Sequence, residues 1–275
     1  MARIASLAVL LSTSGNDYLK ETYGKVIENI QKKTISAKIK NTNLSGSPDG
    51  GSVEAKRFEN RNSQAYGTAR SGGAGQKVKA TPVTVSINVD RELITEIEEK
   101  DVKLYGVDAF VEKQSAMDQK SMERELERAF FTEAKTAGTQ VTLGSGNTPE
   151  EDLEELIQAV ETVQNDFVDG VERDMISVAC VPAFFGKIRT YLDKVTDGGA
   201  NGAEVGMYHG VKVYSSTYLP AGVTKAIAQA DGSVAQPVLP TVKPAERIPL
   251  SNAIATGLFY SYGTKAVAPD LIMWA

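Results

Sequence analysis

Residues 35–89 have the pattern of β-strands but too few apolar side chains to form a core of their own. Apolar and polar residues alternate from Ile35 to Lys40 and again from Val83 to Val89, as in strands with one buried face. Between these runs, the large apolar residues are Leu44, Val53, Phe58, Tyr66 and Val78. A two-stranded hairpin is at best marginally stable alone in water. We therefore expect this segment to be either disordered or an arm that other molecules hold in place, as in a building block.

The net charge of −5 conceals a strong asymmetry along the chain. Residues 1–90 carry 13 Lys/Arg and 7 Asp/Glu (net +6), residues 91–170 carry 8 and 20 (net −12), and residues 171–275 carry 9 and 8 (net +1). A basic segment beside an acidic one predicts complementary surfaces that meet between subunits. The alternative is that these charges are merely solvated faces. The basic residues form no dense run, which weighs against a dedicated reader of nucleic-acid sequence.

Length and composition are those of a soluble protein with one large or two medium domains. The single cysteine, Cys180, excludes an internal disulfide and lies in an apolar run, where we expect a buried, inert thiol. No apolar stretch approaches the roughly 20 residues that a membrane-spanning helix needs. The start, Arg3 followed by the apolar run from Ile4 to Leu11, resembles a short signal peptide but lacks a cleavage site. We expect an N-terminal arm or helix there, and no export.

The longest predicted helix covers about Asp108 to Ala137. This stretch contains no Gly or Pro, is rich in helix formers and stops at Gly138. About thirty residues of helix span roughly 45 Å. Its apolar stripe is narrow, which predicts a helix that packs along one side of a sheet and leaves its other face free. Just before it, the charged segment Arg91–Lys100 has apolar residues at helical spacing.

The second half of the chain reads as alternating helices and strands. Thr148, Pro149 and Glu151 together predict an N-cap, a first helical position and a capping box. The elements expected here are a helix from Pro149 to Asp169–Gly170, a buried strand at Met175–Val181, a helix from Pro182 to Leu192, a strand at Val211–Tyr214, an irregular segment with four prolines at Pro237–Pro249, and strands from Ala253 to Trp274 that turn at Tyr262–Gly263. The whole pattern indicates a mixed α+β fold.

The inventory of catalytic side chains is thin. His209 is the only histidine, which rules out two-histidine metal sites, and we interpret it as a turn residue before a strand. Gly186-Lys187 is followed by Ile188 instead of Ser or Thr, so it is not a phosphate-binding loop. The glycine cluster Gly198–Gly202 follows a helix, unlike a dinucleotide fingerprint. We predict no catalytic, cofactor-binding or metal site, and therefore no enzyme.

The order of elements, together with two local patterns, resembles the major capsid proteins of tailed bacteriophages of the Hong Kong 97 type. The patterns are Gly206–Ser216 leading to Leu219-Pro220, and the strand–proline–helix unit Val178–Phe184. The resemblance implies an α+β capsid fold, with the tip of its extended hairpin at Ser45–Gly51. It divides the chain into an N-terminal arm (1–30), an extended β-hairpin loop (31–90), a peripheral domain with a long spine helix (91–147), an axial domain (148–245) and closing strands of the peripheral domain (246–275).

The same resemblance implies a structural protein that self-assembles into an icosahedral head around double-stranded DNA. The implied partners are many copies of itself in hexamers and pentamers, a portal protein, a separate scaffolding protein, and packaged DNA through non-specific contacts, with no membrane, metal or cofactor. The implied location is the virion, after assembly in the host cytoplasm. In this picture the basic arm and loop lie across the acidic helical middle of an adjacent subunit.

Two other interpretations stay open. One is an encapsulin-like nanocompartment shell that holds protein cargo instead of DNA. The other is a monomeric enzyme or ligand-binding protein with a disordered insertion at residues 40–80. The contents of purified particles distinguish the first alternative, and the molecular size in solution distinguishes the second.

Overall fold

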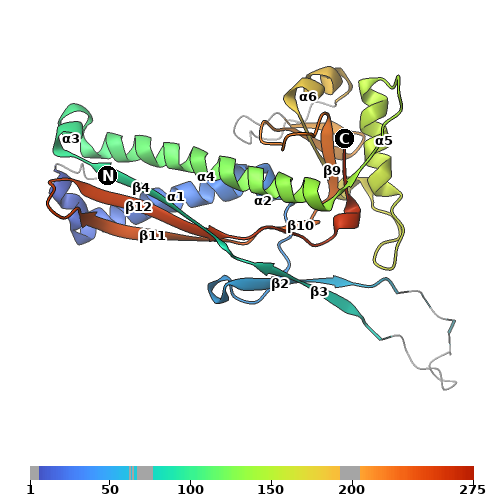
Figure 1. Cartoon of the computed structure of the whole chain (residues 1–275), viewed down its shortest axis with the longest axis horizontal. Coiled ribbons are helices and arrows are strands. Elements are labelled where there is room, and N and C mark those ends of the chain that lie inside the picture. The colour runs from blue at the N-terminus through green and yellow to red at the C-terminus, as the bar shows by residue number, and fades with distance from the viewer. Residues whose placement is uncertain (1–5, 62, 64, 67–76, 193–204) are drawn as a thin grey trace.

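The computed structural model describes residues 6–61, 63, 65–66, 77–192 and 205–275. The molecule has an elongated half, a compact half at one end of it, and a hairpin that projects from the junction of the two (Figure 1). The long helix α4 (Val107–Ala137) runs the length of the elongated half and reaches the compact half. The predicted mixed α+β organisation is confirmed.

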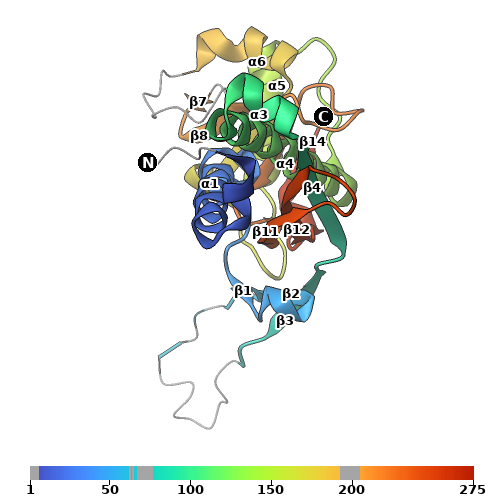
Figure 2. The ribbon, with the colours of Figure 1, turned by 90° about the vertical axis from the view of Figure 1, so that its left-hand side faces the viewer.

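In the elongated half, α4 and the N-terminal helix α1 (Thr13–Lys33) pack on a three-stranded antiparallel sheet. Figure 2 shows the two helices side by side on the sheet, with the hairpin on the far side of it. The strand order is β11 (Val238–Arg247), β12 (Ile254–Tyr262) and β4 (Val89–Ile97), and the half is completed by the 3-10 helix η1 (Leu7–Leu11) and helix α3 (Glu99–Tyr105).

The length of α4 follows from its sequence, as predicted. It has no internal Gly or Pro, and its buried side chains lie on one stripe that includes Val111, Met122, Leu126 and Phe130. The helix ends at Gly138, where a Cβ atom would lie 2.7 Å from the Ala134 carbonyl oxygen and 2.8 Å from that of Ile272. Glycine is therefore required by the close approach of the last strand to the helix end.

The compact half is a six-stranded mixed sheet whose two faces are both covered. Helices α5 (Pro149–Glu161) and α6 (Pro182–Ile188) cover one face, and the end of α4 covers the other. The strand order is β5 (Thr139–Gln140), β14 (Ile272–Trp274), β9 (Ala226–Ala230), β6 (Ile176–Cys180), β8 (Val211–Ser215) and β7 (Val205–Tyr208). Every residue of β6 is buried, which confirms the continuous apolar strand that its sequence predicts.

The other elements form the hairpin and the connections between the two halves. They are α2 (Ile35–Ile39), β1 (Leu44–Ser45), η2 (Pro48–Gly50), β2 (Ser52–Phe58), β3 (Ala80–Ser86), η3 (Arg173–Met175), η4 (Arg189–Tyr191), β10 (Val234–Ala235), β13 (Lys265–Ala266) and η5 (Pro269–Leu271). Strands β3 and β4 follow one another along the chain with only Ile87 and Asn88 between them. The projecting hairpin and the main sheet are thus joined almost without a linker.

The capping box at the start of α5 is confirmed, but the helix is shorter than predicted. The Thr148 hydroxyl accepts from the Glu151 amide at 3.3 Å, and the Glu151 carboxylate accepts from the Thr148 amide at 2.7 Å. The helix ends at Glu161 instead of Gly170. Beyond it, the Asn165 side chain accepts the backbone amides of Phe167 and Val168 at 2.9 and 3.0 Å. This local turn competes with helix formation.

Three element predictions are wrong. Residues 91–97, expected to be helical, form part of β4, which pairs with β12 along its whole length. The proline-containing segment 238–247 is strand β11, where the register shifts between Lys243 and Glu246 at Pro244; this is an edge strand, where proline is tolerated. Residues 35–39 are not a strand but the short helix α2, because the Thr34 hydroxyl caps the amide of Ala37 at 3.3 Å. Pairing with β12 sets the structure of the first two segments, and helix capping sets that of the third.

Candidate interaction surface

The hairpin of β2 and β3 projects from the body of the molecule (Figure 1). The two strands pair antiparallel from Ser52 with Ser86 to Phe58 with Ala80, and β1 pairs with the other edge of β2. The predicted tip, Ser45–Gly51, is in fact the tight turn between β1 and β2, where Gly51 adopts φ 77°. The hairpin instead continues along β2 and β3 as far as the pair Phe58 and Ala80. The predicted position of the tip is therefore wrong, because β2 carries the hairpin beyond this turn.

The root of the hairpin is packed against its own chain. Val53, Ala55 and Val85 are at most 2% exposed and form a small core with Ala235 and Val267. The expectation that this segment has nothing to bury is therefore wrong for the root. The apolar partners come from residues almost two hundred positions further along the chain, and the local sequence gives no sign of them.

A charged clamp holds β2 to the compact half beyond this small core. The guanidinium group of Arg57 donates to both carboxylate oxygens of Asp270, at 2.6 and 2.5 Å, and stacks on the ring of Phe167 at 4.3 Å. The Asn165 side-chain amide donates to the same carboxylate. Burial works against the charge of Asp270, but these hydrogen bonds outweigh it and keep its pKa below the ordinary value. Bidentate pairs of this kind fix direction as well as distance.

Beyond the clamp, large side chains of the described part of the hairpin are open to solvent. Phe58 is 57% exposed, Val78 is 61% exposed and Tyr66 is 91% exposed. No described strand pairs with the outer edge of β3, which leaves a row of backbone donors and acceptors for another chain. Large apolar side chains next to an open strand edge are features of an interaction site.

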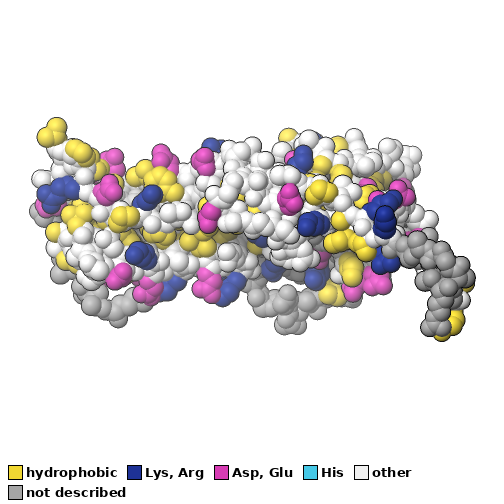
Figure 3. Space-filling view, turned by 90° about the horizontal axis from the view of Figure 1, so that it is seen from below, with side chains coloured by type: hydrophobic (Ala, Val, Ile, Leu, Met, Phe, Trp, Pro, Cys, Tyr) yellow, Lys and Arg dark blue, Asp and Glu magenta, His cyan; other side chains and the backbone are white. Residues whose placement is uncertain are grey.

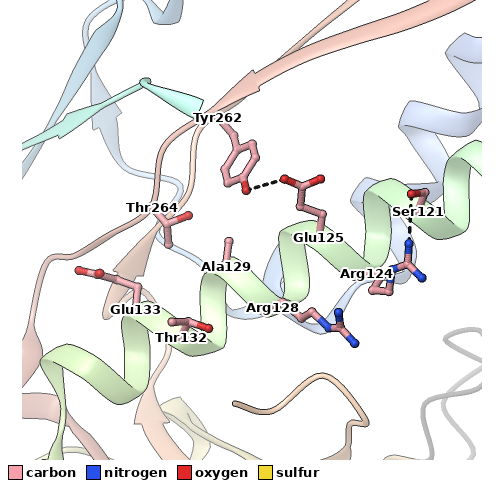
Figure 4. A pocket seen from close by; sticks show the side chains of 9 residues that line it. All are labelled: Ser121, Arg124, Glu125, Arg128, Ala129, Thr132, Glu133, Tyr262 and Thr264. Carbon is pink, nitrogen blue, oxygen red and sulfur yellow. Dashed lines mark hydrogen bonds between the residues drawn. The ribbon is translucent and has the colours of Figure 1, made fainter. Parts of the chain in front are cut away.

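A groove of about 520 Å³ lies between α4 and the end of β12 (Figure 4). Glu125 points from α4 toward Tyr262, whereas Arg124 and Arg128 point away from that strand. The Glu125 carboxylate accepts from the hydroxyls of Tyr260 and Tyr262 at 2.8 and 3.0 Å, and pairs with Arg91. Burial and the neighbouring carboxylate raise the pKa of Tyr262 to about 12.

The side chains and glycine motifs that could carry chemistry lie in separate elements. His209 lies in the turn between β7 and β8 with φ 44° and its ring against Tyr208, so the predicted turn role is confirmed. Cys180 is buried in β6, and this burial raises the pKa of its thiol. Gly186 lies inside α6, and Gly198–Gly202 lies outside the described residues.

Among the described side chains there is no group of three or more His, Cys, Asp or Glu that could hold a metal ion. Likewise, none of the described helices has the length and apolar character needed to cross a membrane.

Comparison with known proteins gives a match in fold but none in sequence. No protein-family model matches the chain, and no curated protein matches it significantly. The capsid structure of the cyanophage P-SCSP1u is 15% identical with a TM-score of 0.59, over 86% of this chain and 85% of that chain. A virus-like particle from Pyrococcus furiosus is 12% identical with a TM-score of 0.59, over 94% and 99%. The capsid of an empty GTA particle is 12% identical with a TM-score of 0.56, over 88% and 89%. At these identities the likeness establishes the fold: the predicted α+β capsid fold is confirmed.

Proposed function

We propose that this chain is the major shell subunit of a tailed bacteriophage head and that it encloses a double-stranded DNA genome. The observation that carries the proposal is the hairpin of β2 and β3. Its root is fixed to the subunit by a small core and by the Arg57–Asp270 pair, while its far part exposes Phe58, Val78 and an open strand edge. A fixed base with an exposed apolar end is the form expected of a part that binds a neighbouring copy.

Charge supports the same arrangement. Residues 1–90 carry a net +6 and residues 91–170 a net −12, and Glu92 and Glu96 are exposed on β4. In the proposed shell the hairpin of one subunit lies over the acidic elongated half of the next. Opposite charges there guide association and fix the register of the contact.

Within this proposal the chain keeps the five segments expected from the sequence, with one adjustment. Residues 1–30 are the N-terminal arm, 31–90 the extended loop, 91–147 and 246–275 the peripheral domain, and 148–245 the axial domain. Strand β11 pairs with β12, so residues 238–245 belong by pairing to the peripheral sheet. The proposed partners are further copies in hexamers and pentamers, a portal protein, a scaffolding protein and DNA. The subunit would be assembled in the host cytoplasm and reside in the virion.

Likeness in fold to the Pyrococcus furiosus virus-like particle, which spans 94% of this chain and 99% of that one, supports a second candidate. This is an encapsulin-like compartment whose shell encloses a protein. The two candidates share every surface described above and differ only in what they enclose. The composition of purified particles separates them: nucleic acid with a portal vertex for the first, an enzyme for the second.

Electron microscopy of the purified protein tests shell formation directly. The decisive variant replaces residues 59–79 by Asn-Gly, because Phe58 pairs with Ala80 and a two-residue turn closes such a hairpin. We expect folded subunits that no longer close shells, with the root core intact. Normal particles from this variant would refute the proposed role of the hairpin. A wild-type protein that elutes as a monomer near 29.5 kDa would refute both shell functions and leave the monomeric enzyme or binding protein.

A further inference from the structure

One face of α4 carries a row of exposed cations. Lys113, Lys120, Arg124 and Arg128 are separated by 7, 4 and 4 residues, and all four are exposed. With 3.6 residues per turn, these positions fall within an arc of about 80°. We call these four residues the basic stripe. At 1.5 Å per residue it is about 22 Å long, on a helix that is rigidly packed along its opposite side.

No acidic residue of α4 falls within this arc, and three of the acids that flank the stripe are bound by other groups. The Glu123 carboxylate accepts from the Gln119 amide at 2.6 Å, and Glu125 is held by two tyrosines and Arg91. Glu127 is 3% exposed and accepts from a backbone amide at 2.7 Å. None of these three carboxylates forms an ion pair with Lys120, Arg124 or Arg128.

The stripe and the hairpin lie on different sides of the subunit. The hairpin root is on the far side of the sheet from α4 (Figures 1 and 2), and Arg124 and Arg128 point away from β12 (Figure 4). On the hairpin side, acidic and basic side chains are interspersed (Figure 3). A run of one sign on an exposed helix face thus contrasts with the interspersed charges on the hairpin side.

We propose that the basic stripe faces the enclosed genome and binds the phosphate backbone of duplex DNA without reading its sequence. This inference rests on the proposed function, because it needs a shell that contains DNA. Duplex DNA carries one negative charge per about 1.7 Å of its axis, so about 13 phosphate charges lie along the length of the stripe. Lysine and arginine on a straight helix contact phosphates, which position a duplex but carry no sequence information. The acidic surroundings (net −12 over residues 91–170) predict weak, strongly salt-dependent binding.

The test compares two full-length variants that lose the same charge. K113Q/K120Q/R124Q/R128Q removes the stripe, and K20Q/K25Q/K32Q/K265Q removes four exposed lysines from α1 and β13. Binding of a labelled 30-base-pair duplex to isolated subunits is measured between 50 and 200 mM salt. Four phosphate contacts give a slope of about −3.6 in log affinity against log salt, or about a 100-fold loss over this range. We expect the stripe variant to lose this salt-dependent component, and the control variant to retain it.

Several results would overturn the inference. These are wild-type subunits that do not bind the duplex, a stripe variant with the wild-type slope, and a control variant that loses as much as the stripe variant. A stripe variant that binds DNA normally but no longer closes shells would show that the stripe is a contact between subunits. Failure of the proposed function is a separate result, since it is the absence of shells from the wild-type protein. Where shells form, the ratio of nucleic acid to protein in stripe-variant particles should fall below that of the control.

Discussion

Glu127, deep in α4, accepts a hydrogen bond from the backbone amide of Ser36 at 2.7 Å. This bond ties the long helix to the start of α2, from which the chain continues into the hairpin. The second carboxylate oxygen of Glu127 is buried without a hydrogen-bond partner among the described residues. A buried carboxylate therefore lies at the point where the hairpin segment leaves the body.

This arrangement predicts a pH-dependent stability. Burial raises the pKa of Glu127 to about 7, from an ordinary value of 4.5, even though the Ser36 amide favours the charged form. Between these values the folded state binds more protons than the unfolded state, so the contribution of Glu127 to stability falls as the pH rises from 4.5 through 7. The full difference is about 3 kcal/mol. Urea unfolding at pH 5 and pH 8 should show this loss in the wild type.

The variant Glu127→Gln is the matched control for that measurement. Its amide oxygen keeps an acceptor for Ser36 but does not titrate between pH 5 and 8. We expect the difference in unfolding free energy between the two pH values to shrink by up to about 3 kcal/mol. An identical pH dependence in both proteins would show that Glu127 does not titrate in this range.

The Arg57–Asp270 clamp should hold the hairpin at its native angle. Breaking it with Asp270→Asn leaves a mostly buried guanidinium with a weaker partner, and we expect a cost of about 2 kcal/mol. The effect should be local, with faster hydrogen exchange in β2 than in β4. A double-mutant cycle with Arg57→Gln isolates the pairwise energy. Unchanged exchange in β2 would mean that the small core alone holds the hairpin.

The exposed end of the hairpin should matter for assembly and not for folding. In F58S/V78S, two side chains that are more than half exposed become polar, so the melting temperature should stay within about 2 °C of the wild type. We expect the concentration needed for shell formation to rise at least about tenfold, as measured by light scattering. Met175→Ser changes a side chain of similar exposure (56%) in the compact half and serves as the control. Equal effects of both variants would argue against a specific role of the hairpin end.

Replacement by alanine should change the stability of the protein in opposite directions at two glycines, one at the end of α4 and one inside α1. At Gly138 a Cβ atom would lie 2.7 Å from the backbone oxygen of Ala134, so Gly138→Ala should cost about 1–3 kcal/mol. At Gly24, in the middle of α1, a Cβ atom meets nothing within 4 Å, and Gly24→Ala should stabilise by about 1 kcal/mol. Thermal unfolding of both variants checks the pair. A stable Gly138→Ala protein would show that the last strand can move away from the helix end.

Elements with local signals were predictable from sequence, whereas those set by distant partners were not. The 31-residue helix α4, the capping box of Thr148 and the buried strand β6 each carry their cause in neighbouring residues. Strand β4 exists because β12, more than 150 residues away, pairs with it, and its own apolar spacing suggests a helix. The core under the hairpin root depends on Ala235 and Val267 in the same way.

The residues of the proposed surfaces also differ in how far the sequence predicts them. The spacing of Lys113, Lys120, Arg124 and Arg128 could have been read from the sequence once the helix was predicted, but only the structure shows that this face is exposed. The clamp between Arg57 and Asp270 has no sequence signal, because the two residues are separated by 213 positions. Long-range pairs of this kind are defined by the fold alone.

The direct passage from β3 into β4 gives the subunit a mechanical property. Two residues, Ile87 and Asn88, span at most about 7 Å, so the joint has almost no slack. Gly263 lies against this joint so closely that a Cβ atom there would be 1.9 Å from the Ser86 oxygen. A displacement of the hairpin end should therefore strain β4, the edge strand of the main sheet. Gly263 packs against the joint and would be the point about which the hairpin turns. In a closed shell, a force that a neighbour applies to the hairpin would thus reach the main sheet of the subunit directly.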